Sequence, residues 1–238
     1  MAFEAHRRIE ANALLLSVLT MLAVAVGGLV LLIPPYLLAG TIEPIAGVAP
    51  YTALELEGRD IYIREGCSVC HSQQVRPFKT ETDRYGRYSL AGENIYDRPF
   101  LWGSRRTGPD LARVGGKYPA SWHWLHFHNP RDLEPRSNMP AFAFLAESEL
   151  DTSSTSRKLE VLRELGHPYS DADIAGAAAS ASAQAATIAS ALRASGISLS
   201  PVEEHSETIA VIAYLETLGR AIRSEPPEKL DLGRPVDE

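Results

Sequence analysis

The start of the chain has the longest uninterrupted hydrophobic pattern. Positions 13 to 33 read ALLLSVLTMLAVAVGGLVLLI and contain no charged residue. A helix rises about 1.5 Å per residue, so this run would cover about 32 Å, enough to cross the hydrocarbon core of a bilayer. Pro34 and Pro35 are expected to end the helix. We therefore predict a transmembrane anchor over residues 1–38.

Two other interpretations of this run are weaker. A signal peptide usually has an apolar region of about 7–15 residues, which is shorter than this one. A helix buried in a soluble core would show a polar stripe, and this run is apolar all round. Arg7 and Arg8 precede the run, whereas the first charge after it is Glu43. The positive-inside rule then predicts a cytoplasmic N-terminus and places the rest of the chain on the opposite side.

The pattern changes to that of a helical domain after a short linker. Residues 39–50, AGTIEPIAGVAP, contain the Gly and Pro residues typical of a linker. Thr52 and Glu55 have the spacing of a capping box, which predicts a helix start. Residues at helical spacing then share one side, and Gly66 is expected to end the helix; they are Leu54, Gly58, Ile61, Tyr62 and Glu65.

The rest of the chain predicts an all-α fold with one long irregular segment. Residues 72–110 hold many turn formers and few helical periods. Helices are predicted over 120–128, 156–165, 170–195 and 202–223. Residues 170–195 are rich in Ala and Ser and have a thin apolar face, so we expect a loosely docked insert within a helical region of about 150–205. The globular domain is predicted to cover 51–225, with a polar tail over 226–238.

Composition adds little to this picture. The chain is 45% hydrophobic and 22% charged, as in ordinary globular proteins, and its net charge is −7. The sequence has no run of basic residues of the kind that would predict nucleic-acid binding. An acidic face could steer a basic partner, although most of these carboxylates are expected to be solvated surface.

The only two cysteines lie three positions apart in Cys67-Ser-Val-Cys70, and His71 follows directly. A disulfide in so small a loop would join little. Zinc needs four ligands, and no second pair accompanies this one. A thiol–disulfide redox pair would be expected in a βαβ setting, which the pattern does not show. The remaining chemistry is covalent haem attachment, for which C-x-x-C-H is the required spacing, with His71 as an axial ligand of the iron.

The sixth iron ligand can be sought among the methionines. Met1 is at the terminus and Met21 lies in the apolar run, which leaves Met139, followed by Pro140. Pro140 restricts Met139 to an extended conformation, which helps to hold a thioether on the metal. Core packing is the ordinary role of a methionine. The alternative ligands are the three histidines of WHWLHFH: His123, His126 and His128.

Other residues are candidates for the surroundings of a haem. An axial histidine needs an acceptor for its second ring nitrogen, and the carbonyl of Pro109 in GPDL could supply it. The propionates need donors or positive charge. The candidates are Arg76, Arg105, Arg106, Tyr96 and Trp102.

Together these motifs resemble a class I cytochrome c, in which the first and last helices cross beside the haem. The resemblance rests on Gly58, Tyr62, the C-x-x-C-H motif, GPDL, Met139-Pro140 and a last helix with Tyr214-Leu215. In that fold Gly58 and Tyr214 are expected at the crossing.

Longer stretches are similar to the monohaem cytochrome subunit of cbb3-type cytochrome c oxidases. They are CSVCHSQQVRPF, DRYGRYS, GENIYDRPFLWGSRRTGPDLARVGGKY, WHWLHFHNPR, SNMPAF and VLRELGHPYSDADIAGA. The Ala/Ser-rich segment around 177–205 is longer than expected for that family.

The resemblance implies an electron-transfer subunit with one haem c, bound through Cys67 and Cys70. Its partners would be a haem–copper catalytic subunit, which reduces O2 to water and pumps protons, and a dihaem cytochrome c subunit. The protein would be a single-pass protein of the bacterial inner membrane with a periplasmic haem domain. Residues 102–106 are expected to face the catalytic subunit. Rival hypotheses are an independent tethered electron shuttle, the cytochrome subunit of a nitric oxide reductase, and a membrane-anchored thiol–disulfide protein.

Overall fold

The fold was analysed in a computed structural model that describes residues 2–37, 42, 45–97, 99–103 and 105–224. The chain divides into two compact units, residues 1–43 and residues 44–238. The linker predicted over 39–50 is described only in part, and the tail predicted over 226–238 lies outside the described residues.

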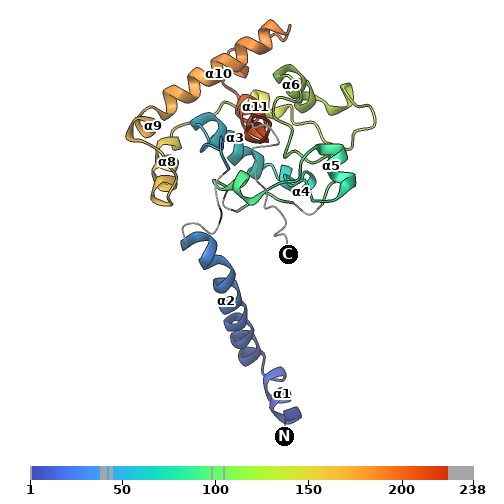
Figure 1. The fold of residues 1–238 in the computed structure, drawn as a ribbon, viewed down its shortest axis with the longest axis vertical. Helices are drawn as coiled ribbons and strands as arrows, with labels where there is room; N and C mark the ends of the chain where they lie inside the picture. Colours follow the sequence, from blue (N-terminus) through green and yellow to red (C-terminus); the bar gives the residue numbers. More distant parts are fainter. Residues whose placement is uncertain (1, 38–41, 43–44, 98, 104, 225–238) are drawn as a thin grey trace, which may run out of the picture. The chain divides into compact units, whose positions relative to one another are not determined.

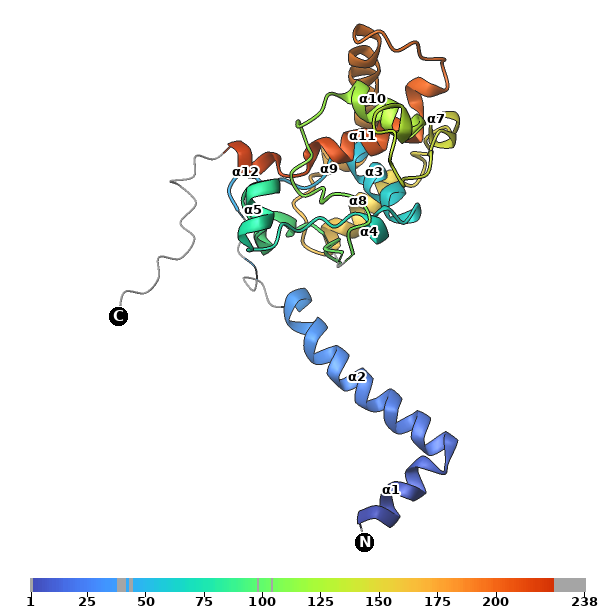
Figure 2. The ribbon, with the colours of Figure 1, turned by 90° about the vertical axis from the view of Figure 1, so that its right-hand side faces the viewer.

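The first unit consists of two helices, α1 (Ala2–Glu10) and α2 (Ala13–Leu37) (Figures 1 and 2). Asn12 separates them, and its side chain accepts a hydrogen bond from the amide of Leu15. The segment of α2 over residues 13–34 is long enough and apolar enough to cross a membrane. The prediction that Pro34 and Pro35 end this helix was wrong. Proline already has a helical φ and costs about 3 kcal/mol inside a helix, which a long helix can absorb.

The second unit is built around the crossing of α3 (Ala53–Arg64) and α11 (Glu207–Thr217), which lie side by side (Figure 1). The predicted capping box of Thr52 and Glu55 begins α3. A Cβ at Gly58 would overlap the carbonyl oxygen of Ala210 and lie 2.9 Å from Cβ of Tyr214. The absence of a side chain at Gly58 therefore lets the two backbones touch, at the crossing that the resemblance implied.

The Ala/Ser-rich segment forms α9 (Asp171–Ala175) and α10 (Ala177–Ala194), which break at Gly176. Ser170 and Asp173 form a capping box at the start of α9. The expectation of a loosely docked insert was wrong, because α10 packs on α3 and α11 with one fully buried face. Small alanine side chains let this helix approach closely, so a face with few large residues is still a packing face. That face comprises Ala177, Ala181, Ala185, Ile188, Ala189 and Leu192.

The other elements are short. They are α4 (Cys67–Cys70), α5 (Lys79–Tyr85), η1 (Ala91–Asn94), α6 (Ala120–His128), η2 (Pro130–Asp132), α7 (Phe144–Glu147), α8 (Thr155–Glu164), η3 (Glu203–His205) and α12 (Arg220–Ser224). Helices α6 and α8 match the predicted helices to within one residue, whereas α5 and η1 lie in the segment that was predicted to be irregular. The predicted last helix is interrupted at Leu218 and Gly219, where Gly219 has φ +75°. The described residues contain no β-strand, only an isolated bridge between Glu149 and Ser206. The all-α prediction is confirmed.

Candidate haem site

The C-x-x-C-H motif lies immediately after the end of α3. Gly66 takes the left-handed conformation with φ +68°, and the chain then forms the single helical turn α4. Residues three apart in a helix share a face, so the turn presents Cys67 and Cys70 on one side. His71 follows in an extended conformation, and its amide donates to the carbonyl of Cys67 at 2.9 Å.

The thiols do not have the environment of a redox-active pair. Cys67 is partly buried and packs against the hydrophobic core, whereas Cys70 is exposed. Burial, and then the charge of Glu65, raise the pKa of Cys67 to about 11. A nucleophilic thiol instead needs a lowered pKa, so that the thiolate is present at neutral pH. The burial of Cys67 and its raised pKa therefore do not favour this thiol as a redox nucleophile.

His71 is oriented by a backbone carbonyl. Its Nδ1 lies 2.8 Å from the carbonyl oxygen of Pro109. Burial lowers the pKa of His71, and the Pro109 carbonyl partly opposes that effect. A neutral imidazole that donates from Nδ1 has a free lone pair on Nε2. An imidazole in this protonation state can bind a metal. Tyr62, from α3, adds a hydrogen bond from its hydroxyl to the backbone carbonyl of His71 at 3.4 Å.

Two glycines let the chain close around this turn. A Cβ at Gly108 would overlap Cε1 of His71 and lie 2.8 Å from both of its ring nitrogens. A Cβ at Gly103 would lie 2.7 Å from the carbonyl oxygen of Ser68 in the turn itself. The segment that contains both glycines is therefore pressed against the motif. This contact and the acceptor for Nδ1 are what a histidine-ligated haem needs on that side.

Met139 lies near the same core. Its side chain is partly buried and packs against the hydrophobic cluster that Cys67 also contacts. The backbone of Met139 is held by two hydrogen bonds, from its amide to Oγ of Ser137 at 3.2 Å and from Arg131 to its carbonyl at 3.2 Å. Its role as sixth ligand stays a prediction.

The three histidines that compete with Met139 differ in their surroundings. His123 is buried, and burial followed by the charge of His126 lowers its pKa to about 4. His126 is partly buried and stacks on Trp122 with ring centroids 4.5 Å apart. His128 is exposed at the end of α6.

The five residues predicted to contact the haem propionates have different surroundings in the structure. The Nε1 donor of Trp102 is buried with no acceptor among the described residues, which suits an anionic group of a haem. Arg105 is exposed. Tyr96 lines a different cavity of about 440 Å³. Arg76 and Arg106 both pair with Glu81, so their guanidinium groups already have a carboxylate partner.

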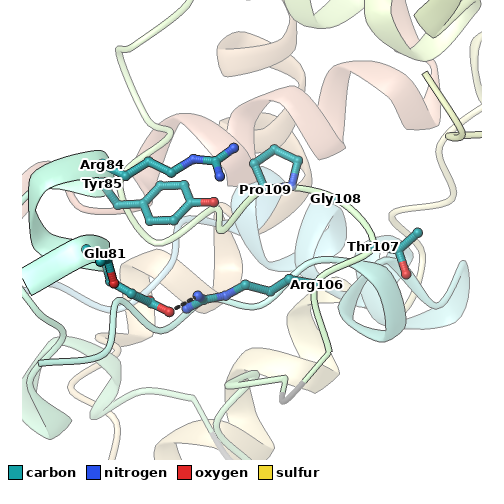
Figure 3. A pocket seen from close by; sticks show the side chains of 8 residues that line it. Glu81, Arg84, Tyr85, Arg106, Thr107, Gly108 and Pro109 are labelled. Atoms are coloured by element: carbon teal, nitrogen blue, oxygen red, sulfur yellow. Dashed lines mark hydrogen bonds and ion pairs between the residues drawn. The ribbon is translucent and has the colours of Figure 1, made fainter. Parts of the chain in front are cut away.

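Arg106, Gly108 and Pro109 also line a cavity of about 470 Å³. Figure 3 shows the Glu81–Arg106 pair there, with the side chains of Arg84 and Tyr85 extending towards Pro109. Sequence reasoning missed Glu81 and the buried Asp110, whose contacts decide how this segment meets the motif. Only the position of Asp110 beside Pro109 could have suggested it.

A zinc site would require several ligating side chains close together. Across the part of the chain that the structure describes, no three His, Cys, Asp or Glu side chains are grouped so that they could hold a metal ion.

Comparison with known proteins gives one result of near full length. Residues 6–222 match a protein-family model described as "Cytochrome C oxidase, mono-heme subunit/FixO". No curated protein matches the chain.

Proposed function

Because the chain belongs to the FixO family of mono-haem cytochrome c oxidase subunits, we propose that it binds one haem c covalently and transfers electrons within a cbb3-type oxidase. The electrons pass towards the haem–copper subunit, which reduces O2 to water. The observation that supports this best is the arrangement of His71, with Nδ1 on the Pro109 carbonyl and Gly108 against the ring.

Each residue of the motif has a distinct task in this proposal. Cys67 and Cys70, on one side of α4, bind the two vinyl groups of the haem. His71 and Met139 would hold the iron, and a bound haem would supply one-electron chemistry there. The buried Nε1 of Trp102 is the proposed donor to a propionate. The protein contributes attachment, orientation and a low-dielectric surrounding.

The oxygen chemistry is assigned to a partner subunit. This chain has a single C-x-x-C-H motif, and its seven histidines show no pattern of a copper site. In our proposal a dihaem cytochrome subunit supplies electrons and the haem–copper subunit receives them and pumps protons. Helix α2 anchors the chain in the bacterial inner membrane, with the N-terminus in the cytoplasm and the haem domain in the periplasm.

Attachment is tested with Cys67→Ser in the full-length chain, with Ser68→Ala in the same turn as the matched control. The wild type and the control should keep their haem through denaturation, as a mass increase and a visible absorption band after acid–acetone extraction. Cys67→Ser should lose much of this covalent haem and assemble poorly with the oxidase. A wild-type chain with only its polypeptide mass and two free thiols would refute the proposal.

Ligation by Met139 is tested with Met139→Ala. The variant should retain covalent haem, because both thioether bonds remain, but its reduction potential should fall because a thioether ligand raises the potential. Potentiometric titration of the purified protein measures the change, with His126→Phe as the control. An unchanged potential in Met139→Ala together with a changed potential in His126→Phe would assign the sixth position to His126.

A further inference from the structure

The guanidinium group of Arg106 makes hydrogen bonds or ion pairs with four other residues. Its Nε donates to Oγ of Ser72 at 2.5 Å, and Nη2 donates to the carbonyl of Gln74 at 2.5 Å and to Asp110 at 3.4 Å. Nη1 pairs with Glu81. The side chain is only 17% exposed. Four of its five N–H groups therefore have acceptors within the protein.

Asp110 is the second centre of this cluster. Its side chain is fully buried. One carboxylate oxygen accepts from Oγ of Ser72 at 2.5 Å and from the amide of Gln74 at 2.8 Å, and the other accepts from the amide of Ala112 at 2.9 Å. Arg106 and Asp110 thus hold the same hydroxyl and the same peptide segment from two sides. That segment is the one that follows the haem motif.

Two backbone hydrogen bonds join the same segments on either side of the axial histidine. The amide of Gly108 donates to the carbonyl of Cys70 at 3.0 Å, and the amide of Leu111 donates to the carbonyl of Ser72 at 2.8 Å. The Pro109 carbonyl, which accepts from the imidazole, lies between the two donors in sequence. Its position therefore depends on how firmly the two segments are held together.

We infer that Arg106 is a positioning residue, which acts through Ser72 and Asp110 to fix the Pro109 carbonyl on Nδ1 of His71. This inference rests on the proposed function, since the orientation of His71 matters because the ring ligates iron. Groups that hold an axial histidine set its orientation and its basicity as a ligand. Arg106 thus influences the iron without contacting it.

The chemistry requires an arginine at this position. Without its guanidinium, the carboxylates of Asp110 and Glu81 would be left in a buried site with fewer donors, and a buried carboxylate that loses its partner destabilises its surroundings. A lysine would keep the charge but has one nitrogen, which cannot reach acceptors in four directions. The Arg106→Lys variant therefore separates geometry from charge.

Arg76→Lys is the matched control. Arg76 also pairs with Glu81, yet no hydrogen bond joins its guanidinium to Ser72 or Asp110. We would measure amide hydrogen exchange of Gly108 and Leu111 and the haem reduction potential in the full-length holoprotein. Arg106→Lys should speed the exchange of both amides about ten-fold and raise the potential, since a less firmly bonded imidazole is a weaker donor to ferric iron. Arg76→Lys should change neither.

Ser72→Ala provides a second, milder variant. It removes the hydroxyl that Arg106 and Asp110 share, and it should speed the same exchange even if Arg106→Lys fails to fold. The inference is overturned if Ser72→Ala, or a folded Arg106→Lys, leaves both amides and the potential unchanged, or if Arg76→Lys matches their effect. A wild-type chain without haem would instead refute the proposed function, and the exchange measurement would still decide whether Arg106 fixes the loop.

Discussion

The two halves of the second unit that meet at the haem motif are held together in opposite ways. On one side, α3 and α11 cross through apolar contacts, with the tilted rings of Tyr62 and Tyr214 5.4 Å apart between centroids and Gly58 against Ala210. On the other side, residues 71–76 and 106–112 form irregular loops joined by buried polar groups around Asp110. The helical half is stabilised by close packing, and the loop half by hydrogen bonds and paired charges.

The two kinds of contact should therefore affect different properties, namely the stability of the fold and the reduction potential of the haem. Apolar burial is non-directional and contributes most to the folding free energy. Hydrogen bonds are directional and fix the position of single atoms, such as the Pro109 carbonyl oxygen at Nδ1 of His71. Changes in the helical half should therefore cost global stability, and changes in the loop half should alter the haem environment first.

The largest effect on stability is expected for Gly58→Ala. The new Cβ would overlap the backbone carbonyl of Ala210, and neither backbone can move without separating the two helices. Overpacking of this kind costs about 3 kcal/mol, more than the ~1 kcal/mol that alanine gains in a helix. Denaturant unfolding monitored by circular dichroism measures the loss. Gly27→Ala, with nothing within 4 Å of the new Cβ, is the control and should have no measurable effect on the unfolding of this unit.

Acid should weaken the packing around His123 before it breaks the ion pairs of Glu81. His123, on the α6 helix that packs on α11, has its pKa lowered to about 4, so the unfolded chain binds a proton more readily. Its contribution is present above pH 6.5 and is lost as the pH falls towards 4, by up to about 3 kcal/mol. Arg106 and Arg76 lower the pKa of Glu81 to about 2, so the contribution of these ion pairs is lost only below about pH 4.5.

Unfolding free energies measured between pH 7 and 4 test this order. His123→Leu removes the titrating group and should flatten the upper part of the curve. An unchanged slope in that variant would contradict the assignment.

The smallest effect on stability, with a strong local consequence, is expected for Gly108→Ala. The added Cβ would meet the ring of His71, which can tilt away, so global unfolding should change by only about 1–2 kcal/mol. The haem absorption spectrum and reduction potential should change clearly, because a tilted ring would lose the hydrogen bond from Nδ1 to the Pro109 carbonyl. A stability loss as large as that of Gly58→Ala, with an unchanged spectrum, would erase the distinction between the two halves.

The sequence predicted much of the helical framework. The capping box at Thr52 and the bounds of α6 agree with the structure, because caps and periodicity are local signals. The docking of α10 was missed, because alanines show a face only when a partner helix covers them. The continuation of α2 past Pro35 was also missed, since proline signals a break without fixing its position.

The candidate site likewise has features that local sequence predicts and features that depend on tertiary contacts. The sequence by itself determined the C-x-x-C-H spacing, the apolar helix and the choice of GPDL as the histidine's partner, because each is a matter of residue types at short separation. Only the tertiary structure decided that Arg106 meets Ser72, Gln74, Glu81 and Asp110. These partners lie on segments whose spacing follows no period, and a network of directional hydrogen bonds exists only once the chain has folded.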